Sequence, residues 1–408
     1  MKYAHLARTA VGLAMGVMVA GNAQASANPH AAEQIGTVRQ MYDGALTPDL
    51  AVNTFRNIDR LFPTHTVAHG SRVFPLPVAA RQLTQVKFTS RGASWDLADY
   101  LAVNRVSGLL VLKNGQIALE LYQYGNTDKT RWMAMSITKS ITSTLIGAAV
   151  KQGYIGSIND PVTKYVPRLT GTAYDGVSIR DVLMMSSGVK WNETYTDPTS
   201  DRRHLLEAQI GQVPGAVLEV MAKLPRAAPP GTVNNYSTGE TQIAGEILHG
   251  AIKRPLAEYL SERIWRKFGM EADATWWLAS PDGMEIAGSG FSATLRDFGR
   301  FGLFFLNGGV AGGEQIVPEG WTREAGSRQA LKDGKKIDYG YLWWPAQPTD
   351  ATPHPGNAFS GIGIFGQYLY LNPQEHVVIV SWGARSKPTG RDIIEDTDFF
   401  AAVTAAVH

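Results

Sequence analysis

Residues 132–150 constrain the fold most, because their pattern is that of a buried helix. Apolar residues recur about every four positions along one side of it: Ile137, Ile141, Leu145, Ala148 and Ala149. This period predicts an amphipathic helix that begins near Ser136 and packs one face against a core. Ser136 and Lys139 are three positions apart, so their side chains lie on the same face of that helix, about one turn apart.

The pairing of Ser136 with Lys139 has a chemical meaning. A serine hydroxyl is a weak nucleophile until a base takes its proton, and a lysine can do so when its surroundings lower its pKa. The helix N-terminus adds partial positive charge where an alkoxide would form. A second Ser-x-x-Lys, at residues 187–190, has Gly188 directly after its serine and no helical apolar period. We interpret that copy as a loop without catalytic function.

The N-terminus has the pattern of a secretory signal. Lys2 and Arg8 precede an apolar run over residues 10–20, and small residues around Ala25 offer a cleavage site. The apolar run is too short to span a bilayer, which disfavours a permanent helical tether. We expect residues 1–25 to be a signal peptide. The mature protein would then be periplasmic or secreted, with no stable membrane insertion after cleavage.

Composition excludes several classes of function. The chain has no cysteine, which rules out disulfides, thiol nucleophiles and cysteine-ligated metals. Its 38 basic and 36 acidic residues give a net charge of +2, so nothing indicates a nucleic-acid partner. The nine histidines show no zinc-ligand spacing, and Gly-x-Ser-x-Gly, the nucleophile elbow of α/β-hydrolases, is absent. We expect no metal and no organic cofactor. The sequence does not indicate an oligomeric state.

Two hairpins frame a helical middle. Residues 106–125 contain Asn114-Gly115 between apolar runs, a strong hairpin signal, and a second hairpin follows over residues 367–382. Between them the apolar period predicts helices over residues 136–153, 178–185, 238–252, 256–268 and 295–306. Early and late strands around helices predict one antiparallel sheet formed from both ends of the chain, with helices packed against it.

The same pattern predicts the domain organisation. Residues 26–104 contain several prolines and glycines and are expected to form an irregular arm on the main body. Residues 105–408 are expected to form the main domain. Its sheet part would comprise about 105–130 and 355–408, and its helical part about 131–354.

Ser136 would need two further elements. Tyr236 precedes a predicted helix, and a phenol beside Lys139 would lose its proton near neutrality and return it to a leaving group. The alternative is a tyrosine that only caps a loop. An oxyanion hole needs two backbone N–H groups: that of Ser136 and one from residues 360–367, whose glycines allow close approach of a substrate. The alternative there is a bulged edge strand with no ligand.

In order and type, these motifs resemble those of the β-lactamase-like serine hydrolases, whose nucleophile motif is Ser-x-x-Lys. Within that group the chain resembles the 6-aminohexanoate-dimer hydrolases most closely, over roughly residues 55–408. The matching stretches are residues 135–140, 160–167, 191–198 and 360–367. The resemblance implies an α+β fold of the β-lactamase/transpeptidase type, with an antiparallel sheet, flanking helices and a mostly helical middle region.

The resemblance also implies roles for single residues. Ser136 would be the acylated nucleophile, Lys139 its base and Tyr236 the acid/base, with the N–H groups of Ser136 and Ile364 as the oxyanion hole. Two residues would contact substrate: Tyr195 and Gly363. The implied activity is cleavage of amide or ester bonds in small linear substrates through an acyl-enzyme. The alternatives are a β-lactamase or D-alanyl-D-alanine carboxypeptidase, or an inactive binding or scaffold homologue.

The chain departs from the family pattern at several positions. Tyr236-Ser-Thr replaces Tyr-x-Asn, and residues 357–361, in place of Lys-Thr-Gly, contain no Lys or Arg. Leu206 aligns with an aspartate of the dimer hydrolases, although Asp201 is close by, and an arginine of residues 201–203 is a candidate cation for a substrate carboxylate. Glu193 is either a hydrolytic base or structural. The pair Trp343-Trp344 either lines a pocket or belongs to the core.

Overall fold

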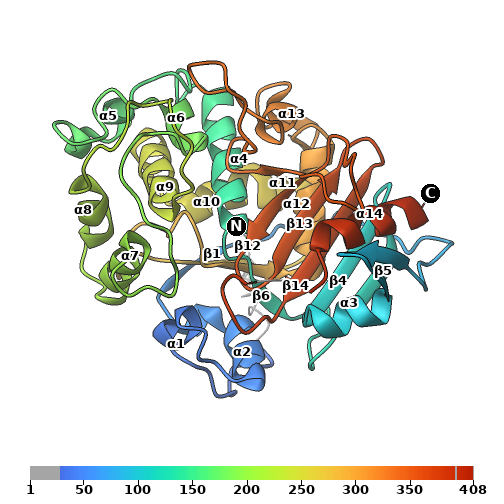
Figure 1. Ribbon diagram of the computed structural model, residues 1–408. Helices are drawn as coiled ribbons and strands as arrows, with labels where there is room; N and C mark the ends of the chain where they lie inside the picture. Colours follow the sequence, from blue (N-terminus) through green and yellow to red (C-terminus); the bar gives the residue numbers. More distant parts are fainter. Residues whose placement is uncertain (1–27, 391–392, 408) are drawn as a thin grey trace, which may run out of the picture.

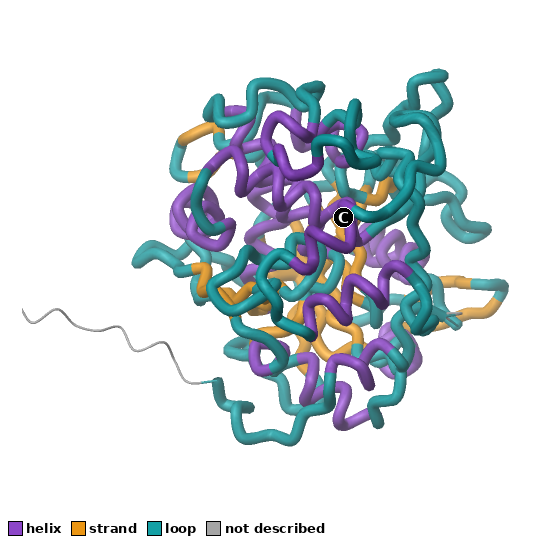
Figure 2. Tube along the Cα trace, turned by 90° about the vertical axis from the view of Figure 1, so that its left-hand side faces the viewer, coloured by secondary structure: helices purple, strands orange, loops and turns teal. Residues whose placement is uncertain are grey.

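The computed structural model describes residues 28–390 and 393–407, so the predicted signal peptide, residues 1–25, lies outside them. A helical region and a sheet covered by helices lie side by side (Figure 1). Turned by 90°, most strands lie in the interior, between helices, and a few short ones lie at the edge of the molecule (Figure 2). Within the described ranges, no helix is both long enough and apolar enough to cross a membrane.

The main sheet has six antiparallel strands in the order β11-β12-β13-β14-β4-β5. Strand β14 pairs with β4, which joins the late strands to the early ones, in a register that runs from Val377 opposite Lys113 to Gly383 opposite Val106. The strands are β4 (Val106–Lys113), β5 (Gln116–Tyr122), β11 (Trp344–Pro345), β12 (Phe359–Gly363), β13 (Gln367–Asn372) and β14 (Val377–Gly383). The prediction of one antiparallel sheet from both ends of the chain is confirmed.

The turn of the first hairpin follows from its sequence. Asn114 and Gly115 have φ angles of 51° and 76°. Both values are positive, as the tight two-residue turn between twisted strands requires, and Asn-Gly is the pair that adopts them most readily.

Both faces of this sheet are buried, because side chains alternate along each strand. On β4, Leu110 and Leu112 pack into the same core as the phenylalanines of α12 (Leu295–Leu306). Leu109 and Val111 point to the opposite face, into a second core with Phe399 and Phe400 of α14 (Asp396–Ala406). The short helix α3 (Leu97–Val103) also packs against β4.

The helical region is built around α4 (Ile137–Lys151) and α9 (Thr238–Ile252), which pack side by side. The five predicted helices are all present. The other three are α6 (Ile179–Leu183), α12, and a continuous segment comprising α10 (Leu256–Leu260), a π-turn (Ser261–Trp265) and α11 (Arg266–Phe268). The sequence pattern did not reveal α7 (Asp201–Ile210), α8 (Ala216–Ala222), α5 (Val162–Tyr165) or α13 (Trp321–Ala325).

A second, smaller antiparallel sheet takes three of its four strands from the part that was expected to be helical and one from the N-terminal segment. Its four strands have the order β1-β7-β8-β6. They are β1 (Thr64–Val67), β6 (Arg131–Met133), β7 (Ala274–Trp277) and β8 (Phe291–Thr294). Each has only three or four residues, too few to show a period of two.

The expectation of an irregular N-terminal arm is wrong in part. The segment holds α1 (Val38–Tyr42), α2 (Pro48–Phe55) and a hairpin of β2 (Lys87–Ser90) with β3 (Ala93–Asp96). Pro48 is the first residue of α2, a position where proline is favoured rather than disruptive. Because β1 pairs with β7, this segment is also joined to the main body. The boundary at residue 104 stays a prediction.

Candidate active site

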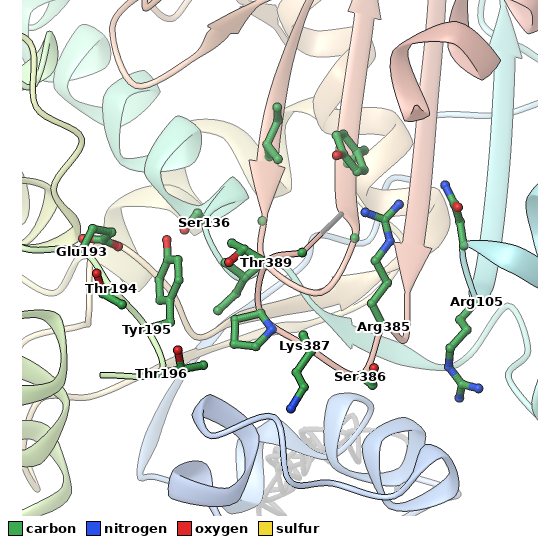
Figure 3. Close-up of a pocket in the computed structure, with 18 of the residues that line it drawn as sticks. Arg105, Ser136, Glu193, Thr194, Tyr195, Thr196, Arg385, Ser386, Lys387 and Thr389 are labelled. Atoms are coloured by element: carbon green, nitrogen blue, oxygen red, sulfur yellow. The ribbon is translucent and has the colours of Figure 1, made fainter. Parts of the chain in front are cut away.

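The serine of the first motif occupies the turn between β6 and α4. Ser136 is the N-cap of α4, and the preceding Met135 has a φ of 44°, a left-handed conformation that is uncommon for a residue other than glycine. Such backbone strain concentrates at functional sites. Ser136 lines a cleft of about 970 Å³ between the helical region and the edge of the main sheet (Figure 3).

Lys139 lies one helical turn below Ser136, and its amine is fully surrounded. Its Nζ is 2.9 Å from the Oγ of Ser136, 3.1 Å from the Oγ1 of Thr238 and 2.9 Å from the carbonyl oxygen of Gly288. Burial lowers the pKa of Lys139 to about 7; Glu193 opposes this shift and Arg202 adds to it. A large fraction of the amine is therefore neutral near pH 7 and able to accept a proton.

Tyr236 lies where the sequence predicts it. Its phenol lies close enough to Ser136 for that side chain to influence its pKa, and its ring centroid is 5.4 Å from the Nζ of Lys139. Trp344 packs against the same ring at 5.2 Å. Burial raises the pKa of Tyr236. The expectation that this phenol loses its proton near neutrality is therefore wrong, because the buried site holds the neutral form.

Strand β12 lies directly against the beginning of α4. A Cβ added to Gly363 would lie 2.5 Å from the carbonyl oxygen of Ala134, and one added to Gly361 would lie 3.0 Å from the Oγ of Ser140. Both positions therefore need glycine for close packing. Ile364 follows at the end of the strand. Within residues 28–390 and 393–407, the backbone N–H groups of Ser136 and Ile364 have no hydrogen-bond acceptor, and both residues line the cleft.

Gly363 and Tyr195 also line the cleft, and their contact with substrate stays a prediction. In Figure 3 the ring of Tyr195 points from its loop toward Glu193 and Ser136. Burial raises the pKa of the Tyr195 phenol, so it acts as a neutral hydrogen-bonding group. Of the tryptophan pair, Trp344 lines the cleft and Trp343 belongs to the core.

Several other candidates lie outside the cleft. Asp201 begins α7, and its Oδ2 accepts from the backbone N–H of Asn192 at 2.8 Å; Leu206 is fully buried in the core. Arg202 and Arg203 are buried too, with Arg202 bound to the hydroxyl of Tyr42 and Arg203 bound to Asp43 at 2.7 Å. Neither arginine lines the cleft. The suggestion that one of them supplies a cation for a substrate carboxylate is therefore wrong.

The second Ser-x-x-Lys is confirmed as a loop. Ser187 is fully buried and donates to Glu240, whereas Lys190 is exposed.

The sequence did not predict two polar neighbours of Lys139 at the candidate site: the hydroxyl of Thr238 and the carbonyl of Gly288. Thr238 was visible only as a departure from Tyr-x-Asn. Gly288 lies 149 residues from Lys139 in the sequence, where no local pattern signals a contact.

The described residues contain no cluster of three or more His, Asp or Glu side chains that could hold a metal. The arrangement instead offers a serine, a buried amine, a neutral phenol and two unpaired N–H groups at one cleft. The model of the β-lactamase family matches residues 98–402.

The chain belongs to the β-lactamase family.

Known relatives agree with this membership. The 6-aminohexanoate-dimer hydrolase of Paenarthrobacter ureafaciens is 30% identical over 352 residues, which cover 83% of this chain and 86% of the relative. Among solved structures, a putative 6-aminohexanoate-dimer hydrolase from Bacillus anthracis has a TM-score of 0.71 and 25% identity, covering 87% of this chain and 92% of that one. EstCE1, described as a hydrolase with promiscuous acyltransferase activity, has a TM-score of 0.60 and 14% identity, covering 76% and 96%.

The β-lactamase-family fold confirms the predicted α+β architecture. Members of this family are serine hydrolases that act on small substrates, so the chain is an enzyme of that class.

Proposed function

We propose that the protein is an exported serine hydrolase that cleaves amide or ester bonds of small linear substrates through an acyl-enzyme on Ser136. The observation that carries this proposal is the amine of Lys139, 2.9 Å from the Oγ of Ser136 and with a pKa lowered to about 7. A base of that pKa is poised to take the serine proton at neutral pH. The similarity to two 6-aminohexanoate-dimer hydrolases supports a linear amide as the substrate.

The proposed reaction has two steps. Lys139 takes the proton of Ser136 as the Oγ attacks the carbonyl carbon, and the N–H groups of Ser136 and Ile364 stabilise the resulting oxyanion. The phenol of Tyr236 protonates the departing amine or alcohol and takes a proton back from the ammonium group of Lys139. In the second step Lys139 accepts a proton from water as the water oxygen attacks the acyl carbonyl carbon. That proton passes to the Oγ of Ser136 as the bond between Oγ and the acyl carbon breaks, and the carboxylic acid leaves.

An inactive scaffold is the competing class of function. All three groups of the proposed machinery lie together at an open cleft, which favours an enzyme. Turnover by the purified protein on short linear amides, p-nitrophenyl esters and a chromogenic cephalosporin tests this directly. Absence of turnover on every member of that panel, together with no fluorophosphonate labelling, would favour the scaffold.

The pH dependence follows from Lys139. Its pKa is lowered, so the amine is charged and unable to act as a base below about 7 and becomes neutral as the pH rises through that value. We expect kcat/KM for an uncharged ester to rise with pH and level off above about 7. The raised pKa of Tyr236 means that no fall follows at mildly alkaline pH. Initial rates at constant ionic strength measure the profile; a kcat/KM that falls as the pH rises through 7 would contradict the role of Lys139.

The cleft predicts a preference against β-lactams. Strand β12 carries no Lys or Arg, so the charge-assisted hydrogen bond expected from a Lys-Thr-Gly strand to a drug carboxylate is missing. Such a bond is worth roughly 1.5–3 kcal/mol, about one to two orders of magnitude in affinity or rate. The cations that do line the cleft are Arg105, Arg385 and Lys387, on the side away from Glu193 (Figure 3).

We therefore expect kcat/KM for short esters or linear amides to exceed that for a cephalosporin. Slow opening of the reactive ring by Ser136 is compatible with this prediction. Faster turnover of a penicillin or cephalosporin than of every linear substrate tried would instead favour the β-lactamase alternative.

Export is proposed from the charged and apolar pattern of residues 1–25. We expect the mature N-terminus to lie between Ser26 and Asn28, with the protein in the periplasm or the medium. N-terminal sequencing of the protein purified from its native cells measures this. Intact Met1 on protein recovered from the cytosol would contradict it.

A further inference from the structure

Glu193 is fixed against the start of α9 by three hydrogen bonds. Its Oε1 lies 2.5 Å from the Oγ1 of Thr238, and its Oε2 accepts from the backbone N–H of Thr238 at 2.9 Å. The indole N–H of Trp191 also donates to Oε2. This arrangement holds the carboxylate on Thr238, and Thr238 in turn contacts Lys139.

The carboxylate determines how the hydroxyl of Thr238 is oriented. A carboxylate can only accept hydrogen bonds, so the single hydroxyl proton of Thr238 must point toward Glu193. The oxygen of Thr238 then faces Lys139 only as an acceptor, at 3.1 Å. The carbonyl oxygen of Gly288, 2.9 Å from the same amine, is also only an acceptor.

These two acceptors leave one orientation for the neutral amine. A neutral lysine has two N–H bonds and one lone pair. With its two N–H bonds directed at Thr238 and Gly288, the lone pair is left for the third neighbour, the Oγ of Ser136 at 2.9 Å. We propose that Glu193 is a positioning residue that, through Thr238, directs the lone pair of Lys139 at the hydroxyl of Ser136.

Without the carboxylate, the hydroxyl of Thr238 is free to turn and donate to the lone pair of Lys139, which would leave Ser136 without a base. This inference rests on the proposed roles of Ser136 and Lys139. It also replaces the interpretation of Glu193 as a hydrolytic base. Because Glu193 and Tyr195 belong to one loop, the same segment that contacts substrate would also orient the base.

The most direct test changes Thr238, through which Glu193 acts on Lys139. Thr238→Val keeps the shape of the side chain but removes the hydroxyl; it should lower kcat by roughly tenfold or more, as loss of an orienting partner does elsewhere, with little change in KM. Thr238→Ser retains the hydroxyl and should restore kcat. A serine variant as impaired as the valine variant would overturn the proposal.

Glu193→Gln tests the charge. It should lower kcat in the same way, and the double variant Glu193→Gln/Thr238→Val should be no worse than Thr238→Val, because Glu193 acts only through Thr238. Multiplicative losses would overturn the proposal. Asp197→Asn, in the same loop but bonded to Thr199, is the matched control and should leave kcat unchanged.

The pH profile separates positioning from loop support. Lys139 is influenced by the charges of Glu193 and Arg202, and Tyr236 beside it is neutral. Because Glu193 raises the pKa of Lys139, Glu193→Gln should move the acidic limb of kcat/KM to lower pH, whereas Asp197→Asn should not. An unmoved limb together with an unchanged kcat would exclude the role.

Two controls keep the outcomes distinct. If Glu193→Gln does not fold, as judged by circular dichroism, the Thr238→Val and Thr238→Ser pair decides alone. Fluorophosphonate labelling of wild-type Ser136 tests the proposed function separately. If Ser136 is not labelled, the proposed function is contradicted. If Ser136 is labelled and Thr238→Val is fully active, only the role of Glu193 is contradicted.

Discussion

Ser136→Ala is expected to reduce turnover of an activated ester by roughly 10⁶-fold, the scale seen when a serine nucleophile is removed from a hydrolase. Labelling by a fluorophosphonate should disappear as well. The reason is geometric: Ser136 is the serine that combines a place on the cleft with a neutral amine at 2.9 Å. Steady-state kinetics and mass spectrometry of the labelled tryptic peptide measure both effects.

Ser187→Ala is the matched control, since Ser187 belongs to the other Ser-x-x-Lys. Its hydroxyl is buried against Glu240 and does not line the cleft. Removing it leaves a buried carboxyl group without that donor, so the free energy of unfolding should fall by about 1–3 kcal/mol. Activity per folded molecule should stay intact. A fluorophosphonate adduct on Ser187 would refute the assignment.

Lys139→Ala and Tyr236→Phe are each expected to lower kcat by at least ~10²-fold, the lower range for a general acid or base. Lys139→Ala removes the proposed acceptor of the serine proton. Tyr236→Phe preserves the ring and its packing on Trp344 but removes the hydroxyl beside Ser136. The measurement is single-turnover acylation and deacylation, which separates the two proton transfers.

The double variant should be much less impaired than the product of the two single losses, because groups that act as a unit are not additive. Tyr195→Phe serves as a comparison, since Tyr195 lines the same cleft but its phenol interacts with Glu193 rather than with Ser136. Nearly wild-type activity in Tyr236→Phe would show that another tyrosine transfers the proton.

Long, periodic and locally signalled elements could be predicted from the sequence. Helix α4 was predictable because its buried face repeats every four residues, and the first hairpin because Asn114-Gly115 suits its turn. Helix α7 could not be predicted because its sequence is polar and it buries two arginines, so it shows no apolar period. The strands of the small sheet could not be predicted because they are too short to show an alternating pattern.

The residues of the candidate site also fall into those that local sequence predicts and those that it does not. Ser136 and Lys139 are neighbours on one helix, so their approach is a property of local sequence. Thr238 and Gly288 reach Lys139 only through tertiary packing, and so does Glu193. The protonation state of Tyr236 could not be predicted for a related reason. Burial raises its pKa, and the burial of a single loop residue cannot be derived from the sequence.

The pairing of β14 with β4 also bears on biosynthesis. A ribosome delivers β4 and β5 first, and the strand that pairs with β4, Val377–Gly383, is made only long afterwards. Until then the backbone groups along the open edge of β4 have no strand to pair with. Strand β12, which ends just before Ile364, is also made long after β4 and β5. The proposed oxyanion hole needs Ile364, so it forms only after this late strand has been made, and the proposed hydrolysis cannot begin while the sheet contains only β4 and β5.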